Sequence, residues 1–199
     1  MQYEAHVTVH KFNEIALRRL DGHELCGCLV KTMLLHNIHK DNTESSQLIA
    51  TANYGSSTDG GAIYMVTAIA AALGVWLRDM TQESEIHRLK VEKQIPPVLD
   101  KIPAMAGQYY ETHLRYDCAD NDLLYRIISL MPHAHLSRSE WRPNRRYVTV
   151  RTCSTQHLGI ADSVRSAIKV GMNQEPQKIT HEHAIFDSNP ELDEKWIRS

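Results

Sequence analysis

The sequence predicts an α+β fold in which a βαββαβ ferredoxin-like unit occurs twice in tandem, as antiparallel sheets with the helices on one face. Two observations predict this duplication. Residues 3–9 and residues 110–116 share the pattern Y-E-x-H-hydrophobic-x-hydrophobic. The strand and helix patterns that follow these two segments also come in the same order, and such internal repetition indicates repeated structural units.

Hydrophobic periodicity predicts the elements of the first half. Apolar residues at i, i+3 and i+4 predict a short helix at 15–20. The Ala-rich segment 61–80 predicts a long helix, which we expect to end near Gly74 because glycine often terminates helices. Alternating or continuous apolar segments predict strands. These strands are 3–9, 29–35, 47–53 and 86–95.

The second half repeats this order of elements. Helical spacing predicts helices at 122–131 and 157–172, the second of which ends near Gly171. The strands predicted by alternation are 110–116, 134–137, 146–152 and 179–186. Prolines in the segment between the halves break regular structure. We therefore expect a first unit at 1–97, a linker at 98–107, a second unit at 108–187 and a tail at 188–199.

The composition is that of a globular protein. The 199 residues are 42% hydrophobic and 23% charged, and the formal net charge is -2. This balance argues against a general nucleic-acid or membrane-surface binder, which carries a basic surplus. No apolar segment reaches the ~20 residues of a membrane span, and the first residues do not resemble a signal peptide. We therefore expect a cytoplasmic protein without a membrane partner.

Cysteines and paired histidines are the candidates for metal ligands. Cys26 and Cys28 have C-x-C spacing, whereas disulfide scaffolds hold more cysteine and zinc sites usually have C-x-x-C pairs. We therefore predict reduced thiols. H-x-H pairs at 133–135 and 181–183 place two imidazoles on one strand face, but no carboxylate or cysteine at a recognisable spacing completes a ligand set. The sequence thus predicts no metal and no other cofactor.

The first strand of each unit has one polar face, because side chains alternate along a strand. These faces carry Glu4, His6 and Thr8 in the first unit and Glu111, His113 and Arg115 in the second. The apolar faces are expected to pack on the helices. If the two units meet around one cleft, the polar faces line it. The alternative is that they are solvated faces of two sheets.

Two histidines are the predicted catalytic residues. His6 and His113 occupy equivalent positions in the two units. Histidine titrates near neutral pH and is the usual general acid or base. Glu4 and Glu111 share their faces and are predicted to bind the ligand or to orient the imidazoles. The alternative is a pair of structural histidines at domain contacts.

A short motif supports this assignment. The tetrapeptide H-V-T-V at 6–9 resembles the H-x-T/S-x motif of the 2H phosphoesterases. Those proteins have two lobes whose two motifs face a shared cleft, where the histidines act as acid and base and the hydroxyl residues hold the phosphate. The resemblance implies these roles for His6 and Thr8. The second unit departs from the motif, because Arg115 stands where threonine or serine is expected.

Further phosphate-binding candidates lie in the second unit. Arginine binds phosphate through two parallel hydrogen bonds, and hydroxyl groups add neutral donors. The candidates are Ser137, Arg138, Thr149 and Arg151, together with Arg115 and Thr8. Surface solubility is the alternative explanation for the arginines.

Together these features predict a protein that binds a phosphate-bearing ligand, a nucleotide or phosphodiester, in a cleft between the two repeats. A phosphodiesterase-type hydrolase that uses the histidine pair is the catalytic form of this hypothesis. The alternative is a non-catalytic module of the same fold that binds a nucleotide, RNA or a protein partner. A third hypothesis is a structural or host-interaction protein. RNA is the weaker ligand, because the predicted central strands lack exposed aromatic residues for base stacking.

Overall fold

The computed structural model describes residues 1–10, 18–38, 44–80, 85–95, 104–118 and 121–190. Its strands are β1 (Gln2–His10), β2 (Glu24–Leu25), β3 (Cys28–Ile38), β4 (Glu44–Gly55), β5 (Glu85–Gln94), β6 (Tyr109–Asp117), β7 (Ala134–Ser139), β8 (Arg145–Thr152) and β9 (Lys178–Asp187). Its helices are α2 (Asp59–Met80), α3 (Asn121–Ser129) and α4 (His157–Met172). Part of the helix predicted at 15–20 lies outside the described residues, as does most of the tail predicted at 188–199.

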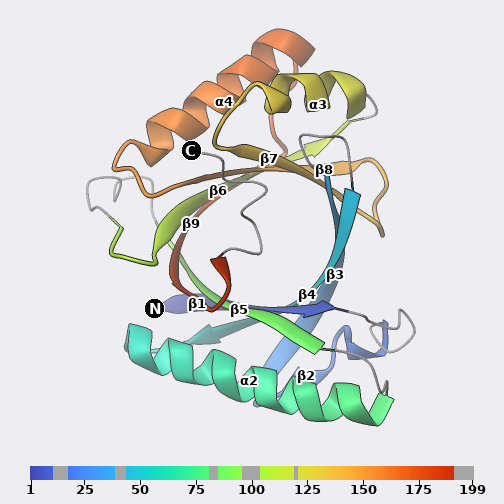
Figure 1. The fold of residues 1–199 in the computed structure, drawn as a ribbon, viewed down its shortest axis with the longest axis vertical. Coiled ribbons are helices and arrows are strands. Elements are labelled where there is room, and N and C mark those ends of the chain that lie inside the picture. The colour runs from blue at the N-terminus through green and yellow to red at the C-terminus, as the bar shows by residue number, and fades with distance from the viewer. Residues whose placement is uncertain (11–17, 39–43, 81–84, 96–103, 119–120, 191–199) are drawn as a thin grey trace.

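The strands form one closed barrel (Figure 1). The pairing order is β2-β3-β4-β1-β5-β9-β6-β8-β7, and β3 also pairs with β7. Eight strands therefore close into a ring of antiparallel pairs, and β2 only extends the hairpin with β3. The predicted ferredoxin-like duplication with separate antiparallel sheets is wrong. An open sheet leaves unpaired N–H and C=O groups at both edges, and the pairings of β5 with β9 and of β3 with β7 satisfy them.

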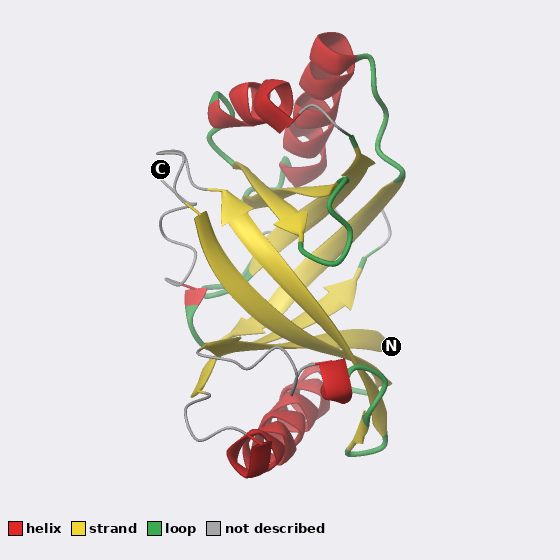
Figure 2. Ribbon diagram, turned by 90° about the vertical axis from the view of Figure 1, so that its right-hand side faces the viewer, coloured by secondary structure: helices red, strands yellow, loops and turns green. Residues whose placement is uncertain are grey.

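The helices cover two sides of the barrel. Figures 1 and 2 show α2 against the strands of the first half, whereas α3 and α4 lie together on the far side, against the strands of the second half. The described helices therefore all lie on the outer face of the strands, and the two helices of the second half lie together. The strand faces that point away from the helices form the inside of the barrel. The order of pairing is the same in both halves, β3-β4-β1-β5 and β7-β8-β6-β9.

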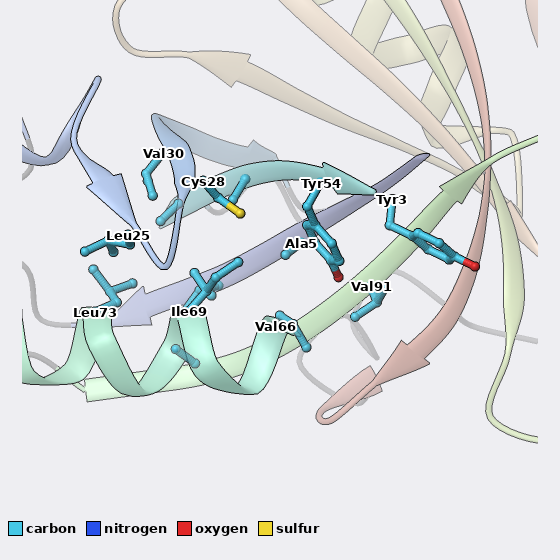
Figure 3. Packing of buried hydrophobic residues seen from close by; sticks show 14 of the residues in the cluster. Tyr3, Ala5, Leu25, Cys28, Val30, Tyr54, Val66, Ile69, Leu73 and Val91 are labelled. Carbon is cyan, nitrogen blue, oxygen red and sulfur yellow. The ribbon is translucent and has the colours of Figure 1, made fainter. Parts of the chain in front are cut away.

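Apolar side chains of α2 pack on the outer surface of the first half (Figure 3). Those of Ala62, Val66, Ile69, Leu73 and Leu77 recur at helical spacing and are at most 2% exposed. The facing residues of β1 are Tyr3, Ala5, Val7 and Val9. Burial of each larger side chain contributes roughly 1.5–3 kcal/mol. This cluster therefore holds the apolar face of β1 outward and turns its polar face into the barrel.

The helix predicted at 61–80 is α2, which ends at Met80 as predicted. The role expected for Gly74 is wrong, because this glycine lies within the helix and does not end it. Among the described helices, α2 is also long and apolar enough to cross a membrane, with a mean hydropathy of 1.8 over Asp59–Asp79. Core helices of globular proteins share this property. One face of α2 packs on the first half of the barrel.

A glycine brings α3 and α4 together over the second half. A Cβ atom at Gly171 would lie 2.6 Å from Ile127 Cδ1, so only glycine permits this approach without movement. The helix ends at Met172, and Asn173 adopts the left-handed conformation with φ 53° and donates its N–H to the Lys169 carbonyl. Gly171 therefore serves close helix packing, and Asn173 ends the helix.

The C-x-C spacing is explained by a tight hairpin. Cys26 and Gly27 are the two loop residues between β2 and β3, and both have positive φ, at 52° and 74°. Two-residue hairpin loops of type I′ require positive φ at both positions. Cys28 is buried beneath this hairpin, and all four cysteines are free thiols, as the sequence predicted.

Candidate functional site

The barrel holds a half-open cavity of about 320 Å³ that is lined by both charged and apolar side chains. Every second residue of a barrel strand points inward, so the polar faces of the strands meet there. The charged and imidazole side chains that line the cavity are Glu4, His6, Arg88, Lys90, Glu92, Glu111, His113, Arg115, Arg151, Lys178 and Glu182. Charges that are withdrawn from water have to compensate one another. The contacts between these side chains therefore determine the chemistry of the cavity.

His6 is held by residues of three strands. Its Nδ1 lies 3.0 Å from Thr51 Oγ1 on β4, and its Nε2 lies 2.6 Å from Glu92 Oε2 on β5. Glu4 Oε1, on the same strand as His6, lies 3.8 Å from that Nε2. A protonated imidazole donates from both nitrogens, and here both nitrogens face oxygen atoms. The surroundings of His6 therefore favour its protonated form.

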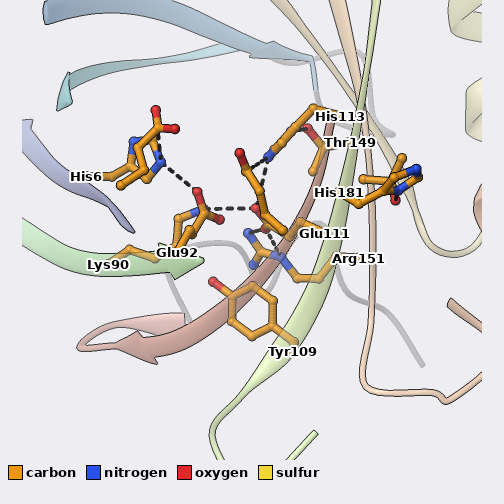
Figure 4. A network of polar contacts seen from close by, with 12 residues as sticks. His6, Lys90, Glu92, Tyr109, Glu111, His113, Thr149, Arg151 and His181 are labelled. Atoms are coloured by element: carbon orange, nitrogen blue, oxygen red, sulfur yellow. Dashed lines mark hydrogen bonds and ion pairs between the residues drawn. The ribbon is translucent and has the colours of Figure 1, made fainter. Parts of the chain in front are cut away.

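The same arrangement recurs around His113. Its Nδ1 lies 3.0 Å from Thr149 Oγ1 on β8, and its Nε2 lies 3.0 Å from Glu182 Oε2 on β9. Glu111 Oε2 on β6 lies 3.3 Å from that Nε2. Figure 4 shows the two imidazoles on either side of the carboxylates of Glu92 and Glu111. Because both halves have the same strand order, one set of contacts is built twice around one cavity.

Two side chains with a permanent positive charge contact the glutamates around the histidines, and one of them, Lys90, joins the His6 contacts to the His113 contacts. Lys90 Nζ lies 2.6 Å from Glu92 Oε1 and 2.9 Å from Glu111 Oε2. Arg151 Nε donates a 2.6 Å hydrogen bond to Glu111 Oε1, and the Nη2 of Arg151 contacts the same oxygen. A continuous chain of contacts therefore runs from His6 through Glu92, Lys90 and Glu111 to His113.

These contacts shift the pKa of each group toward its charged form. Burial lowers the pKa of His6, but the carboxylates of Glu92 and Glu4 outweigh it and the net pKa is raised. Burial also opposes protonation of His113, yet Glu182 and Glu111 raise its pKa well above the usual value. Burial raises the pKa of Glu111, but Arg151 and Lys90 hold it well below the usual value. Lys90 and His6 likewise outweigh burial and lower the pKa of Glu92.

A buried tyrosine, Tyr109, packs against the guanidinium group of Arg151. The Tyr109 ring lies 4.4 Å from the guanidinium carbon of Arg151, which places the cation over the π face. The Tyr109 hydroxyl donates to Asp187 Oδ2 at 2.5 Å and accepts from Arg88 Nη2 at 2.9 Å. Arg88 Nε also donates to Asp187 Oδ1 at 2.8 Å. Tyr109 is therefore fixed at its hydroxyl and holds the cation that pairs with Glu111.

One group of described residues could hold a metal ion. The candidate ligand atoms of Glu92, Glu111, His113 and Glu182 lie within 4.8 Å of one another. Carboxylate and imidazole groups suit a divalent transition metal. Lys90 and Arg151 already neutralise part of this charge, and protonated imidazoles neutralise more. A metal here would compete with the imidazole protons, and the predicted absence of a metal stays a prediction.

Two further cations lie near one end of the barrel. Arg115 is close to the end of β6, and it pairs in register with Lys178, the first residue of β9. In the described part of the chain no carboxylate forms an ion pair with either side chain, and the buried Nε of Arg115 has no hydrogen-bond partner. Tyr147 and Ser137 line the same cavity. This end of the cavity therefore has cationic groups that no described carboxylate compensates.

The structure brings together nine of the ten residues that the sequence singled out. His6, His113, Glu4, Thr8, Glu111, Arg115, Ser137, Thr149 and Arg151 all line the cavity. Arg138 does not: its side chain lies 3.6 Å from Glu140. The imidazoles of the 181–183 pair also lie outside, where His181 contacts Thr112 and His183 stacks on Tyr110.

The sequence interpretation missed Lys90, Glu92 and Glu182, which complete both sets of contacts. The signal was present in each strand. The predicted strand 86–95 alternates so that Arg88, Lys90 and Glu92 share one charged face. In the 181–183 segment the two histidines share one face, and Glu182 between them points the other way, into the barrel.

No protein-family model and no curated protein match the chain. Solved structures with a partial likeness include a dye-decolorizing protein from V. cholerae, with 9% identity and a TM-score of 0.30 over 96% of this chain and 95% of that chain. A second, from Lactobacillus acidophilus NCFM and provisionally described as a monooxygenase, has 10% identity and a TM-score of 0.32 over 92% and 93%. These scores carry no argument about function. The comparisons do not bear on the 2H phosphoesterase resemblance, and they lend no support to a hydrolase or to phosphate binding.

Proposed function

We propose that the barrel cavity binds a small phosphate-bearing ligand and that His6 and His113 transfer protons to and from it. The observation that supports this proposal best is the arrangement of the two imidazoles. Each is held by a threonine and two glutamates, and both face one cavity. Electrostatic interactions between side chains that are withdrawn from water are stronger than in bulk solvent.

Arg115 and Lys178 are the groups that we expect to bind the phosphate. Each offers N–H donors to the cavity, and neither forms an ion pair with a described carboxylate. A phosphate oxygen would supply the missing partner of the buried Arg115 Nε. Guanidinium and ammonium groups form strong, charge-assisted hydrogen bonds with phosphate. The anion would therefore bind beside His113, which lies two residues before Arg115 on β6.

The two histidines are suited to different roles. His113 has the more exposed side chain, at 29% against 15% for His6, and its longer contact is to Glu111. A ligand oxygen can replace that contact at Nε2. Because its neighbouring carboxylates raise the pKa of His113 well above the usual value, we expect His113 to hold its proton and act as the acid. The pKa of His6 is raised less, so His6 would act as the base once it has lost its proton, and turnover should increase as pH rises through the pKa of His6.

A phosphodiester would react in one displacement. His6 takes a proton from water while the water oxygen bonds to phosphorus. The bond from phosphorus to the leaving oxygen breaks, its electron pair stays on that oxygen, and His113 donates the proton. The products are a phosphate monoester and an alcohol. We also propose a cytoplasmic location, because all four cysteines are free thiols and a reducing compartment keeps them so.

The experiment combines binding with turnover. Titration calorimetry with phenyl phosphate should give a dissociation constant that rises about tenfold or more in Arg115→Gln, since a charged hydrogen bond is worth roughly 1.5–3 kcal/mol. Arg138→Gln is the matched control and should bind as the wild type does, because Arg138 lies outside the cavity. Hydrolysis of bis(4-nitrophenyl) phosphate should be lost in His6→Gln and in His113→Gln.

The outcomes separate the hypotheses. Binding that depends on Arg115 without any turnover supports the non-catalytic alternative. Equal losses in the Arg115 and Arg138 variants would contradict the proposed phosphate site. Turnover that survives in both histidine variants would contradict the catalytic assignment.

A further inference from the structure

The cavity has an apolar wall opposite its charged wall. Met33 and Leu35 on β3 and Ile49 on β4 line the cavity. None of the three belongs to either hydrophobic core, and each is only half-buried. In the ring of strands, β3 and β4 lie four positions from β9 and β6, which carry Glu182 and His113. The apolar side chains therefore face the charged cluster across the barrel.

This wall is unexplained by folding alone. Apolar side chains that face a polar, charged cavity gain little from burial, whereas polar residues at the same positions could hydrogen-bond to the cluster. The outer faces of β3 and β4 have the usual pattern, since Leu34 and Leu48 there are buried. An apolar group in the cavity would complete the packing of the wall.

We infer that the ligand of the barrel is an amphiphilic organic anion, whose apolar body lies on Met33, Leu35 and Ile49 while its anionic group binds Arg115 and Lys178. This inference rests on the proposed function and names its substrate class. The cavity, at about 320 Å³, is near the lower limit of small-molecule pockets, which span roughly 300–1,000 Å³. A phosphate ester of a compact aryl or alkyl alcohol has this chemistry.

The geometry also sets where the ligand reacts. Consecutive residues of a strand advance by about 3.3 Å, so the backbones of His113 and Arg115 are about 6.6 Å apart along β6. Side chains two residues apart lie on the same face of the strand, so an anionic group at Arg115 is a neighbour of the His113 imidazole. The apolar body extends from this point across the barrel toward Ile49 and Leu35. The reacting atom is thus at the junction between the anionic and apolar parts of the ligand.

A ligand series tests the inference on the wild-type protein. Inorganic phosphate, phenyl phosphate, hexyl phosphate and phenylacetate are titrated by calorimetry. We expect the two phosphate esters to bind at least about tenfold more tightly than inorganic phosphate, because each buried methylene group favours binding by severalfold. Leu35→Gln should weaken phenyl phosphate binding about tenfold and change inorganic phosphate binding by less than about twofold.

The matched control is Leu29→Gln, the same substitution on the same strand. Leu29 is 57% exposed and does not line the cavity, so its replacement should change neither affinity. Equal affinities for inorganic phosphate and for both esters overturn the inference but leave the proposed function standing. Tighter binding of phenylacetate than of phenyl phosphate supports the amphiphilic anion and overturns phosphate as its charged group. If no anion in the series binds, both proposals fail.

Discussion

Lys90 Nζ donates a 2.9 Å hydrogen bond to Glu111 Oε2, and this contact joins the two halves of the chain inside the barrel. Strand β9 lies between β5 and β6, so the two residues meet across the interior and not as neighbours in a strand pair. The same ammonium group lies 2.6 Å from Glu92. Lys90 therefore couples the carboxylate that pairs with His6 to the carboxylate that pairs with His113.

Replacement of this lysine is expected to destabilise the barrel strongly. In Lys90→Met the buried carboxylates of Glu92 and Glu111 lose a shared partner, and loss of one member of a buried ion pair costs about 3–5 kcal/mol. Urea unfolding measures the change in free energy. The control is Lys169→Met, which removes an exposed partner of Glu175 and should change stability by less than about 0.5 kcal/mol. Similar effects of the two variants would contradict the bridging role of Lys90.

The stability of the protein should decline on both sides of neutral pH. Glu92 and Glu111 have lowered pKa values, so they stabilise the fold above the unfolded value of about 4.3 and lose this contribution as pH falls through the folded value. His6 and His113 have raised pKa values. Their contribution is complete below the unfolded value of about 6.5 and is lost as pH rises through the folded value.

Unfolding free energies across about pH 3 to pH 10 measure both declines. In His113→Gln the alkaline decline should become shallower, because the group with the strongly raised pKa is gone. Nuclear magnetic resonance of the imidazoles gives an independent reading. A His113 that titrates below about 6.5 would contradict the proposed charge compensation.

Two changes at Tyr109 separate its hydroxyl from its ring. Tyr109→Phe keeps the ring over Arg151 and removes only the two hydrogen bonds of the hydroxyl, while Arg88 and Asp187 keep their ion pair; a hydrogen bond to a charged group contributes about 1.5–3 kcal/mol. Tyr109→Leu also removes the cation–π contact, worth about 0.5–2 kcal/mol. We expect the leucine variant to be the less stable in thermal unfolding. Equal stability of the two variants would show that the contact with Arg151 contributes nothing.

Two glycines of α4 should respond differently to alanine. Gly171→Ala places a Cβ atom 2.6 Å from Ile127 Cδ1, the far end of a flexible side chain that can move aside, so the overpacking cost should not exceed about 1 kcal/mol, the low end of the usual range. Gly159→Ala meets nothing within 4 Å and should gain up to about 1 kcal/mol from helix propensity. A second change, Ile127→Val, removes the clashing Cδ1 and should recover part of the Gly171→Ala loss in a double-mutant cycle. Additive effects of these two changes would exclude the clash.

Local periodicity predicted most of the elements with good accuracy. The helix expected at 157–172 has these bounds in the structure, and the strand expected at 86–95 is Glu85–Gln94. The exception is Gly74, which lies within α2 and does not end it. A glycine in a helix lowers its stability by only about 1 kcal/mol relative to alanine. The apolar residues on both sides of Gly74 outweigh this cost by packing on the barrel.

The candidate site was predicted in part. Alternation placed His6 and His113 on polar faces, and both line the cavity. Arg138 does not line the cavity, because neighbouring strand residues point to opposite faces and its neighbour Ser137 points inward. The partners that complete the site, Glu92 and Glu182, lie on the last strand of each half. Their significance depends on which strands pair, which local spacing does not show.

The sequence by itself determined where strands and helices form and which face of each strand is polar. Both follow from the spacing of apolar residues over a short segment of the chain. Only the tertiary structure decided that the pairings of β5 with β9 and of β3 with β7 close the sheet into a barrel. These pairings join segments far apart in the chain, and their hydrogen bonds are available to any exposed strand edge. Closure also decided the electrostatics, since buried charges such as Lys90 and Glu111 are compensated only once the polar faces enclose one cavity.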